Sequence, residues 1–279
     1  MLLAARDRIP QGAIAMPDPP STPEVAAVAG GIGGIGPGIV IALTQRDFDV
    51  VVCDRTIDPA IAERMTPSAA LGARLSFIRI DLADPADLPR FLDAIFAALG
   101  HIECLVNNAG VSAKSRGDLL DVSAESHDLN FAVNTRSAFF FTQAVCKMLA
   151  AEGDFPESPR SVVFISSSNA FIAAPERGKY AMSKAAVAMM TKLFAIRLAP
   201  NGIAVYEVRL GLIHTPMTGV AQSRFDGLLV DGFTPINRWC RPEDVGRAIE
   251  TMAADELPFT TGAAIQAMAE ISPNTEPRI

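Results

Sequence analysis

The segment VAAVAGGIGGIG, residues 25–36, decides the fold of this chain. Its first five residues are apolar and predict a short buried strand, and the glycines that follow let the backbone turn tightly. A helix is predicted from Ile35 to about Gln45, so its first amides would face the glycine turn, where they can bind a phosphate group. Taken alone, such a turn is also typical of a hinge or a close-packed turn.

The next predicted strand favours a nucleotide site over a hinge. Residues 50–53 are three valines and a cysteine, and they lead directly into Asp54. A carboxylate roughly 20 residues after the glycine turn can accept hydrogen bonds from an adenosine ribose. The order of strand, glycine turn, helix, strand and acid therefore predicts one half of a dinucleotide-binding site.

Strands and helices alternate along the rest of the chain. Apolar runs predict strands at 75–80, 105–106, 162–168, 203–208 and 263–267, and helical spacing predicts helices at 84–96, 123–151, around 180–184 and from 242. This order predicts an α/β fold, a single Rossmann-type, doubly wound parallel sheet with helices on both faces. Residues 25–279 are expected to form one dinucleotide-binding catalytic domain with a substrate lid at about 216–241. Residues 1–24 are proline-rich and predict a flexible leader, within which Met16 is an alternative start to Met1.

The composition argues against several classes of function. The chain has 279 residues, a formal net charge of −7 and a pI near 5.0, and its basic residues are scattered, so no nucleic-acid partner is expected. The four cysteines lie far apart, which predicts reduced thiols in a cytoplasmic protein and no metal site. Residues 25–45 carry no charge, but their six glycines and one proline argue against a membrane helix.

A second constellation lies around Tyr180. If this stretch is helical, Lys184 lies one turn further along the same face, and its ammonium would draw the pKa of the phenol toward neutral pH. Tyr180 could then pass a proton to or from a substrate oxygen. Ser167 ends the apolar strand upstream, at the edge of a parallel sheet where sites are usual. A solvent-exposed helix face is the alternative for a lone Tyr and Lys pair.

Taken together, these residues resemble the short-chain dehydrogenase/reductase family over nearly the whole chain after Glu24. The resemblance implies a catalytic set made of Asn134, Ser167, Tyr180 and Lys184. Spacing and resemblance together give the expected cofactor-binding set: Gly30, Gly34, Ile35, Gly36, Asp54, Arg55, Asp81, Leu82, Asn108, Ala109, Gly110, Tyr180, Lys184, Gly211, Ile213 and Thr215.

The resemblance also implies a chemistry. Tyr180 would be the general acid when a carbonyl is reduced and the base when an alcohol is oxidised. Ser167 would bond the substrate oxygen, Lys184 would lower the tyrosine pKa and hold the nicotinamide ribose, and Asn134 would position a water. The chain is thus expected to be an NAD(P)-dependent oxidoreductase that interconverts a carbonyl and a secondary alcohol. A 3-oxoacyl thioester is one expected substrate, because residues 177–180 resemble those of proteins labelled 3-oxoacyl-acyl-carrier-protein reductases. A sugar or another small alcohol is the alternative.

Two further expectations concern the cofactor and the assembly. Asp54 would repel a 2′-phosphate, so NAD is expected rather than NADP, while Arg55 argues in the opposite direction and leaves NADP possible. The predicted helices from Ser123 and from Tyr180 carry more apolar residues than one sheet face can cover, which favours a homotetramer. His214, in the expected nicotinamide segment, is a minor candidate for a substrate contact.

Four departures from the family pattern support an alternative. Ala29 stands where a Thr is usual, Ala170 where a Gly is usual, Leu210 where a Pro is usual, and residues 267–270 replace a usual Asp-Gly-Gly. None removes a catalytic atom. The alternative is a non-catalytic dinucleotide-binding protein of the same fold, and its weakness is that binding alone does not require the four catalytic residues.

Overall fold

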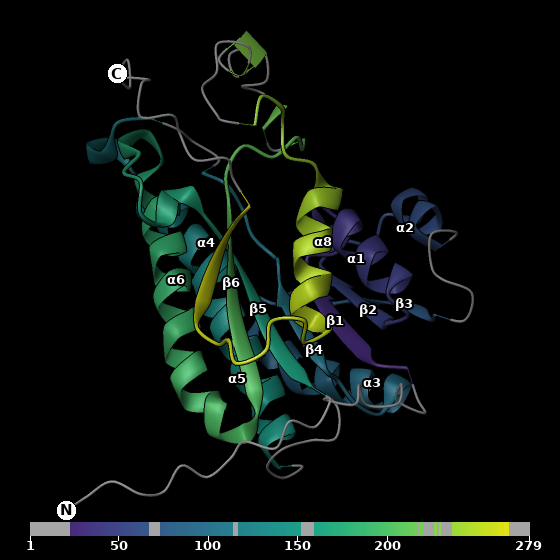
Figure 1. Ribbon diagram of the computed structural model, residues 1–279. Helices are drawn as coiled ribbons and strands as arrows, with labels where there is room; N and C mark the ends of the chain where they lie inside the picture. Colours follow the sequence, from purple (N-terminus) through teal and green to yellow (C-terminus); the bar gives the residue numbers. More distant parts are fainter. Residues whose placement is uncertain are drawn as a thin grey trace, which may run out of the picture.

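One parallel sheet of seven strands organises the molecule (Figure 1). The computed structural model describes residues 23–66, 73–113, 117–151, 159–216, 218–219, 226–227, 229 and 236–267. In spatial order the strands are β3 (Leu75–Arg79), β2 (Asp49–Asp54), β1 (Val25–Ala29), β4 (Cys104–Asn107), β5 (Arg160–Ser167), β6 (Ile203–Leu210) and β7 (Ala263–Ala267). Every neighbouring pair is parallel. The predicted Rossmann-type, doubly wound sheet is confirmed.

Helices cover both faces of this sheet, because successive residues of each central strand point to opposite sides. The helices are α1 (Gly36–Gln45), α2 (Pro59–Met65), α3 (Leu88–Leu99), α4 (Ala124–Phe131), α5 (Ser137–Ala151), α6 (Gly178–Leu198) and α8 (Pro242–Ala253). On β5, Phe164 packs into a core with residues of α3, α5 and α6, whereas its neighbour Ile165 packs with residues of α1 and α8. Figure 1 shows α1 and α8 together on one side of the sheet and α6 on the other.

Two glycines let α1 and α8 approach closely. A Cβ atom on Gly38 would lie 2.5 Å from the backbone of Pro242, and one on Gly246 would lie 2.3 Å from the Gly38 carbonyl oxygen. Gly38 belongs to the uncharged segment 25–45, and the lack of a side chain at this position allows the close packing of the two helices. Within the described residues, no helix has the length and apolar character that crossing a membrane requires.

The helix predicted at 123–151 is interrupted. The structure has α4, then one π-helical turn at Ala132–Arg136, then α5. The widened turn carries Asn134, whose side chain bonds to groups outside its own helix. The spacing of apolar residues does not predict a π-helical turn, because such a turn adds one residue without ending the helix.

Three expectations fall wholly or partly outside the described residues. They are the leader, of which residues 1–22 are not described, the departure at residues 267–270, of which 268–270 are not described, and much of the lid segment. The leader and the lid therefore stay predictions. Where the lid segment is described, Ile213 and Cys240 form a parallel bridge, and Leu229 is buried. The bridge places Cys240, near the end of the 216–241 segment, beside Ile213, three residues after the end of β6.

Candidate active site

A cavity of about 990 Å³ lies where the strands of the sheet end. It opens beside β1 and β4, the neighbours between which the strand order reverses, and such a switch point is where ligands bind in open α/β sheets. The expected residues that line it are Gly30, Gly34, Ile35, Asp54, Arg55, Asp81, Leu82, Asn108, Ala109, Gly110, Ser167, Tyr180, Lys184, Gly211, Ile213 and Thr215. Two expected residues, Gly36 and Asn134, are not part of the cavity lining.

The glycine turn after β1 is held by steric constraints. Gly30 has a φ of +73°, and a Cβ atom there would lie 2.6 Å from the Cα of Ala109. A Cβ atom on Gly36 would lie 2.4 Å from the Gly30 carbonyl oxygen. The Asn108 side chain donates to that same carbonyl at 2.5 Å. The turn is therefore clamped between α1 and the end of β4, and Gly36 acts through packing.

Asp54 connects the end of β2 to the glycine turn. Its Oδ2 accepts a hydrogen bond from the backbone N–H of Ile32 at 3.1 Å, and the residue also lines the cavity beside Arg55. Asp81, further along the same edge, accepts from the N–H of Ala83 at 3.0 Å. Both acids shape backbone turns while they line the cavity.

Asn134 is buried behind the cavity and links three segments. Its Oδ1 accepts from the N–H of Val111 at 2.7 Å, and its Nδ2 donates to the Val111 carbonyl and to the Ser183 hydroxyl, each at 3.0 Å. The Ser183 hydroxyl in turn donates to the Tyr180 carbonyl at 2.8 Å. The π-helical turn thus fixes the first turn of α6, and Ser183 is a member of the site that sequence reasoning missed.

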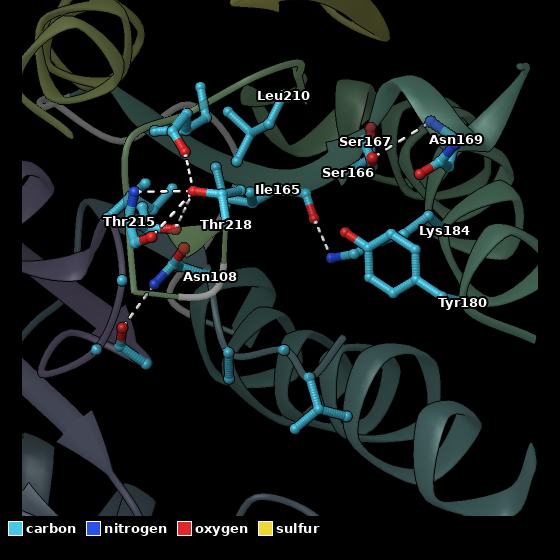
Figure 2. Close-up of a pocket in the computed structure, with 18 of the residues that line it drawn as sticks. Asn108, Ile165, Ser166, Ser167, Asn169, Tyr180, Lys184, Leu210, Thr215 and Thr218 are labelled. Atoms are coloured by element: carbon cyan, nitrogen blue, oxygen red, sulfur yellow. Dashed lines mark hydrogen bonds between the residues drawn. The ribbon is translucent and has the colours of Figure 1, made fainter. Parts of the chain in front are cut away.

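Tyr180, Ser167 and Lys184 meet at the end of β5 (Figure 2). Ser167 is the last residue of β5, and its hydroxyl accepts from the N–H of Asn169 at 3.2 Å. The Lys184 amine donates to the Ile165 carbonyl at 2.8 Å and lies 5.9 Å from the centroid of the Tyr180 ring. Figure 2 shows this amine beside the hydroxyl end of the Tyr180 ring. The helix spacing predicted from the sequence is present, and the face is buried rather than solvent-exposed.

Burial dominates the titration of both groups. It lowers the pKa of Lys184 from 10.5 to about 8, because a charged amine is poorly solvated there. It also raises the pKa of Tyr180 above 10, and a hydrogen bond with Ser167 and the charge of Arg177 only partly offset this rise. The expectation that Lys184 draws the pKa of Tyr180 downward is therefore wrong for this structure: the charge that lowers this pKa is that of Arg177, and desolvation of the phenol outweighs it.

Arg177 is a second residue that the sequence analysis did not select. Its guanidinium lies over the Tyr180 ring, 4.7 Å from the centroid, and it also lines the cavity. Its Nη2 donates to the Ser112 hydroxyl at 3.4 Å. The only signal in the sequence was its position three residues before Tyr180.

Thr218 organises the segment after β6. Its hydroxyl accepts from the N–H of Thr215 at 3.0 Å and donates to the Ile213 carbonyl at 2.6 Å, and all three residues line the cavity. His214 points elsewhere: its ring meets Trp239 edge to face at 5.8 Å, and it is not part of the cavity lining. The minor expectation of a substrate contact from His214 is not supported.

Comparison with known proteins gives a consistent result. The family described as enoyl-(acyl carrier protein) reductase matches residues 30–267. Oxidoreductase UcpA of Escherichia coli is 29% identical over 248 residues, covering 86% of this chain and 91% of that protein. The 2-dehydro-3-deoxy-D-gluconate 5-dehydrogenase of Escherichia coli is 30% identical over 244 residues, covering 87% and 92%.

A solved structure agrees with the sequence relatives. The crystal structure of 3-oxoacyl-[acyl-carrier protein] reductase from Brucella melitensis in complex with NAD superposes with a TM-score of 0.84. It is 40% identical and covers 90% of this chain and 97% of its own. The family match at residues 30–267 includes every residue that lines the cavity, from Gly30 to Ala267.

Proposed function

The chain belongs to the short-chain dehydrogenase/reductase family and is an oxidoreductase, and from this premise we propose that it interconverts a carbonyl and a secondary alcohol with NAD(H) or NADP(H). One observation carries the proposal. The Tyr180 hydroxyl, Ser167 and the buried Lys184 amine line the same cavity as the constrained glycine turn at Gly30. A proton-transfer group and a phosphate-binding turn in one cavity suit hydride transfer between a dinucleotide and a substrate.

The residues present fit a dinucleotide. The turn at Gly30 leaves no space for a side chain, so the backbone can approach a pyrophosphate, and α1 directs its N-terminus at this position. Asp54 would hold the adenosine ribose, and residues 211–215 would border the nicotinamide. A bound nicotinamide supplies or accepts the hydride. The alcohol loses a hydride and a proton as it becomes a carbonyl, and the reverse reaction returns both.

The side chains of this protein carry out the proton transfer of the reaction. Burial keeps Tyr180 protonated at neutral pH, so it is suited to donate a proton to the oxygen that forms when a carbonyl is reduced. Ser167 would bond the same oxygen. Lys184 would hold the ribose and receive the proton in the oxidation direction, since its pKa of about 8 lies near neutral pH. Asn134 would keep the first turn of α6 in register through Ser183.

We propose a preference for NAD over NADP, with NADP possible. The Asp54 carboxylate lies at the end of β2 and accepts a hydrogen bond from the Ile32 N–H, which supports its proposed place beside the adenosine ribose. A 2′-phosphate there would meet a like charge. Arg55 also lines the cavity and would moderate the preference.

The names of relatives suggest substrates but do not select one. They include a reductase of 3-oxoacyl thioesters and a dehydrogenase of a sugar acid. A 3-oxoacyl thioester, a sugar or another small alcohol therefore stays the proposed range. We place the enzyme in the cytoplasm, where reduced thiols such as buried Cys53 and Cys104 are stable.

We propose a homotetramer from the outer faces of α5 and α6. Large apolar side chains are exposed there at Phe139, Phe140, Met189, Leu193 and Ile196, the last at 77% of its surface. A monomer rarely leaves so many large apolar side chains of neighbouring helices in water. A two-fold axis would bury them against a second copy, and two such dimers would form the tetramer. Light scattering at micromolar concentration is expected to give about four times the 29.6 kDa chain mass. The monomer mass would reject the proposal.

A panel of secondary alcohols and sugars, assayed by cofactor reduction with both NAD and NADP, tests the proposed function. Turnover of at least one compound is expected, together with saturable cofactor binding. Binding without turnover across the panel would instead favour the non-catalytic dinucleotide-binding alternative. Both alternatives predict cofactor binding, so the presence or absence of turnover is the result that separates them.

A further inference from the structure

Arg177 places a cation at the substrate end of the cavity. Its guanidinium lies 4.7 Å from the centroid of the Tyr180 ring and shares the cavity lining with Ser167. The other cationic side chains of the described lining have different positions or tasks. Arg55 is at the ribose end, and Arg238 makes a paired contact with Asp244, at 2.6 and 3.0 Å. Lys184 is bonded to the Ile165 carbonyl behind the phenol.

The surroundings of Arg177 suit an anion. Apolar residues line the same cavity, among them Val111, Leu129, Val133, Ile172 and Ala174, together with the polar Ser168 and Asn169. A guanidinium between such walls gains more from an ion pair than it would in water. Arg177 also immediately precedes α6, a helix of 21 residues whose N-terminus favours negative charge. Glu176 lines the cavity too, but its side chain is exposed.

Resting on the proposed function, we propose that the substrate is a hydroxy acid or oxo acid whose carboxylate binds Arg177 while its reacting oxygen binds Tyr180 and Ser167. The reacting oxygen must come within hydrogen-bonding distance of the Tyr180 hydroxyl. A carboxylate one or two carbons from the reacting carbon then reaches the guanidinium that lies over the same ring. The oxidation converts the C–H and O–H of the alcohol into C=O. The hydride passes to the nicotinamide, and the Tyr180 hydroxyl takes the alcohol proton while it gives its own proton to the neutral Lys184 amine.

Pairs of compounds that differ only in the acid group test this proposal. Suitable pairs are lactate with propane-1,2-diol, 3-hydroxybutyrate with butane-1,3-diol, and gluconate with sorbitol. For at least one pair, the wild type is expected to show a kcat/KM about 10- to 100-fold higher for the acid, the usual size of a charge-assisted hydrogen bond. Equal rates within every pair, or a preference for the neutral partner, would overturn it.

Variants of the arginine separate recognition from a general effect on Tyr180. Arg177→Gln is expected to bring the ratio of kcat/KM for the acid to that for its neutral partner down to about one, and Arg177→Lys is expected to keep part of the preference. Any change that both partners share reports the loss of the Arg177 charge beside Tyr180. The matched control is Arg197→Gln at the far end of α6, which removes an exposed arginine and leaves the preference unchanged. If Arg177→Gln slows acid and alcohol by the same factor, the residue acts only through Tyr180 or through folding, and the proposal fails.

The outcomes also distinguish this inference from the proposed function. Turnover of neutral alcohols with no preference for acids rejects the role of Arg177 and leaves the oxidoreductase standing. If nothing turns over, the proposed function fails, and calorimetry of the same acids on the complex with NADH still decides the anion site. Binding that is lost in Arg177→Gln supports the site, and equal binding to wild type and variant rejects it.

Discussion

At the proposed ribose and phosphate end of the cavity, the shape of the site is set by the backbone. At the Tyr180 end, it is set by buried side chains. Gly30 and Gly36 are fixed by steric contacts of 2.4–2.6 Å that an added Cβ would make. Tyr180 and Lys184 are fixed by burial, which shifts the pKa of each away from its ordinary value. The two ends should therefore respond to substitution in opposite ways. Changes at the glycine turn should damage folding and binding, and changes at Tyr180 should damage chemistry alone.

Tyr180→Phe is expected to have the largest effect. It deletes the oxygen that carries the proton and keeps the ring beneath Arg177, so kcat should fall about 10²- to 10⁴-fold. The dissociation constant for NADH, measured by fluorescence titration, should change little. The chain has one other tyrosine, Tyr206, which is buried on β6 outside the cavity lining, and Tyr206→Phe is the matched control. Wild-type kcat in Tyr180→Phe would disprove the catalytic assignment.

Lys184→Met should impair both catalysis and cofactor binding. The amine is proposed to hold the ribose and to relay the proton, so steady-state assays should show kcat lowered about 100-fold and NADH bound more weakly. A variant that lost activity and kept its NADH affinity would show that Lys184 serves the proton alone.

The same substitution has a pH-dependent effect on stability. The folded protein holds Lys184 with a pKa of about 8 against 10.5 when unfolded, so the unfolded chain binds more protons between these values. The wild type should therefore gain stability relative to Lys184→Met as pH rises from about 8 to 10.5, and below pH 8 the cost of burying the charge is present in full. Urea denaturation of both proteins at pH 7, 8, 9 and 10 measures the difference. A constant difference would mean that the amine is not desolvated.

Gly30→Ala tests the end controlled by the backbone. The added methyl would meet Ala109 at 2.6 Å in a left-handed conformation, which should lower the free energy of unfolding by about 2 kcal/mol and weaken cofactor binding. Gly33→Ala is the control for stability, because its Cβ would meet no atom within 4 Å. Thermal unfolding of the two variants gives the comparison. Equal midpoints would show that the turn relaxes around the methyl group.

Asp54→Ala is expected to give the smallest effect. Removing the carboxylate should strengthen NADPH binding relative to NADH by about 5- to 10-fold, the size of a like-charge contact near water. Titration of both reduced cofactors measures the ratio. Tighter binding of NADPH to the wild type, unchanged in Asp54→Ala, would overturn the proposed preference for NAD.

The parts of the fold that depend on local patterns could be predicted from the sequence. The strand at Ala263–Ala267 agrees with its prediction at both ends, and β1 does so as well. Apolar runs bounded by glycines and polar residues define buried strands without reference to the rest of the chain. The glycine turn and Asp54 were also accessible, because their spacing along the sequence reflects one βαβ unit.

The parts that depend on contacts between distant segments could not be predicted. In the π-helical turn, the Asn134 side-chain amide forms hydrogen bonds with both Val111 and Ser183. These residues are far apart in the sequence, so no local pattern predicts their contact. The direction of the Tyr180 pKa was predicted wrongly for a related reason. Helix spacing shows a neighbouring charge, but the degree of burial that outweighs it is a property of the folded molecule.

Transfer of deuterium tests the central claim most directly. Secondary alcohols of the panel that carry deuterium on the reacting carbon are incubated with the protein and NAD, and the cofactor is analysed by mass spectrometry. The account predicts one deuterium per reduced nicotinamide with the wild type and with Tyr206→Phe, and almost none with Tyr180→Phe. A cofactor that binds but gains no label from any alcohol, or equal labelling with Tyr180→Phe, would contradict it.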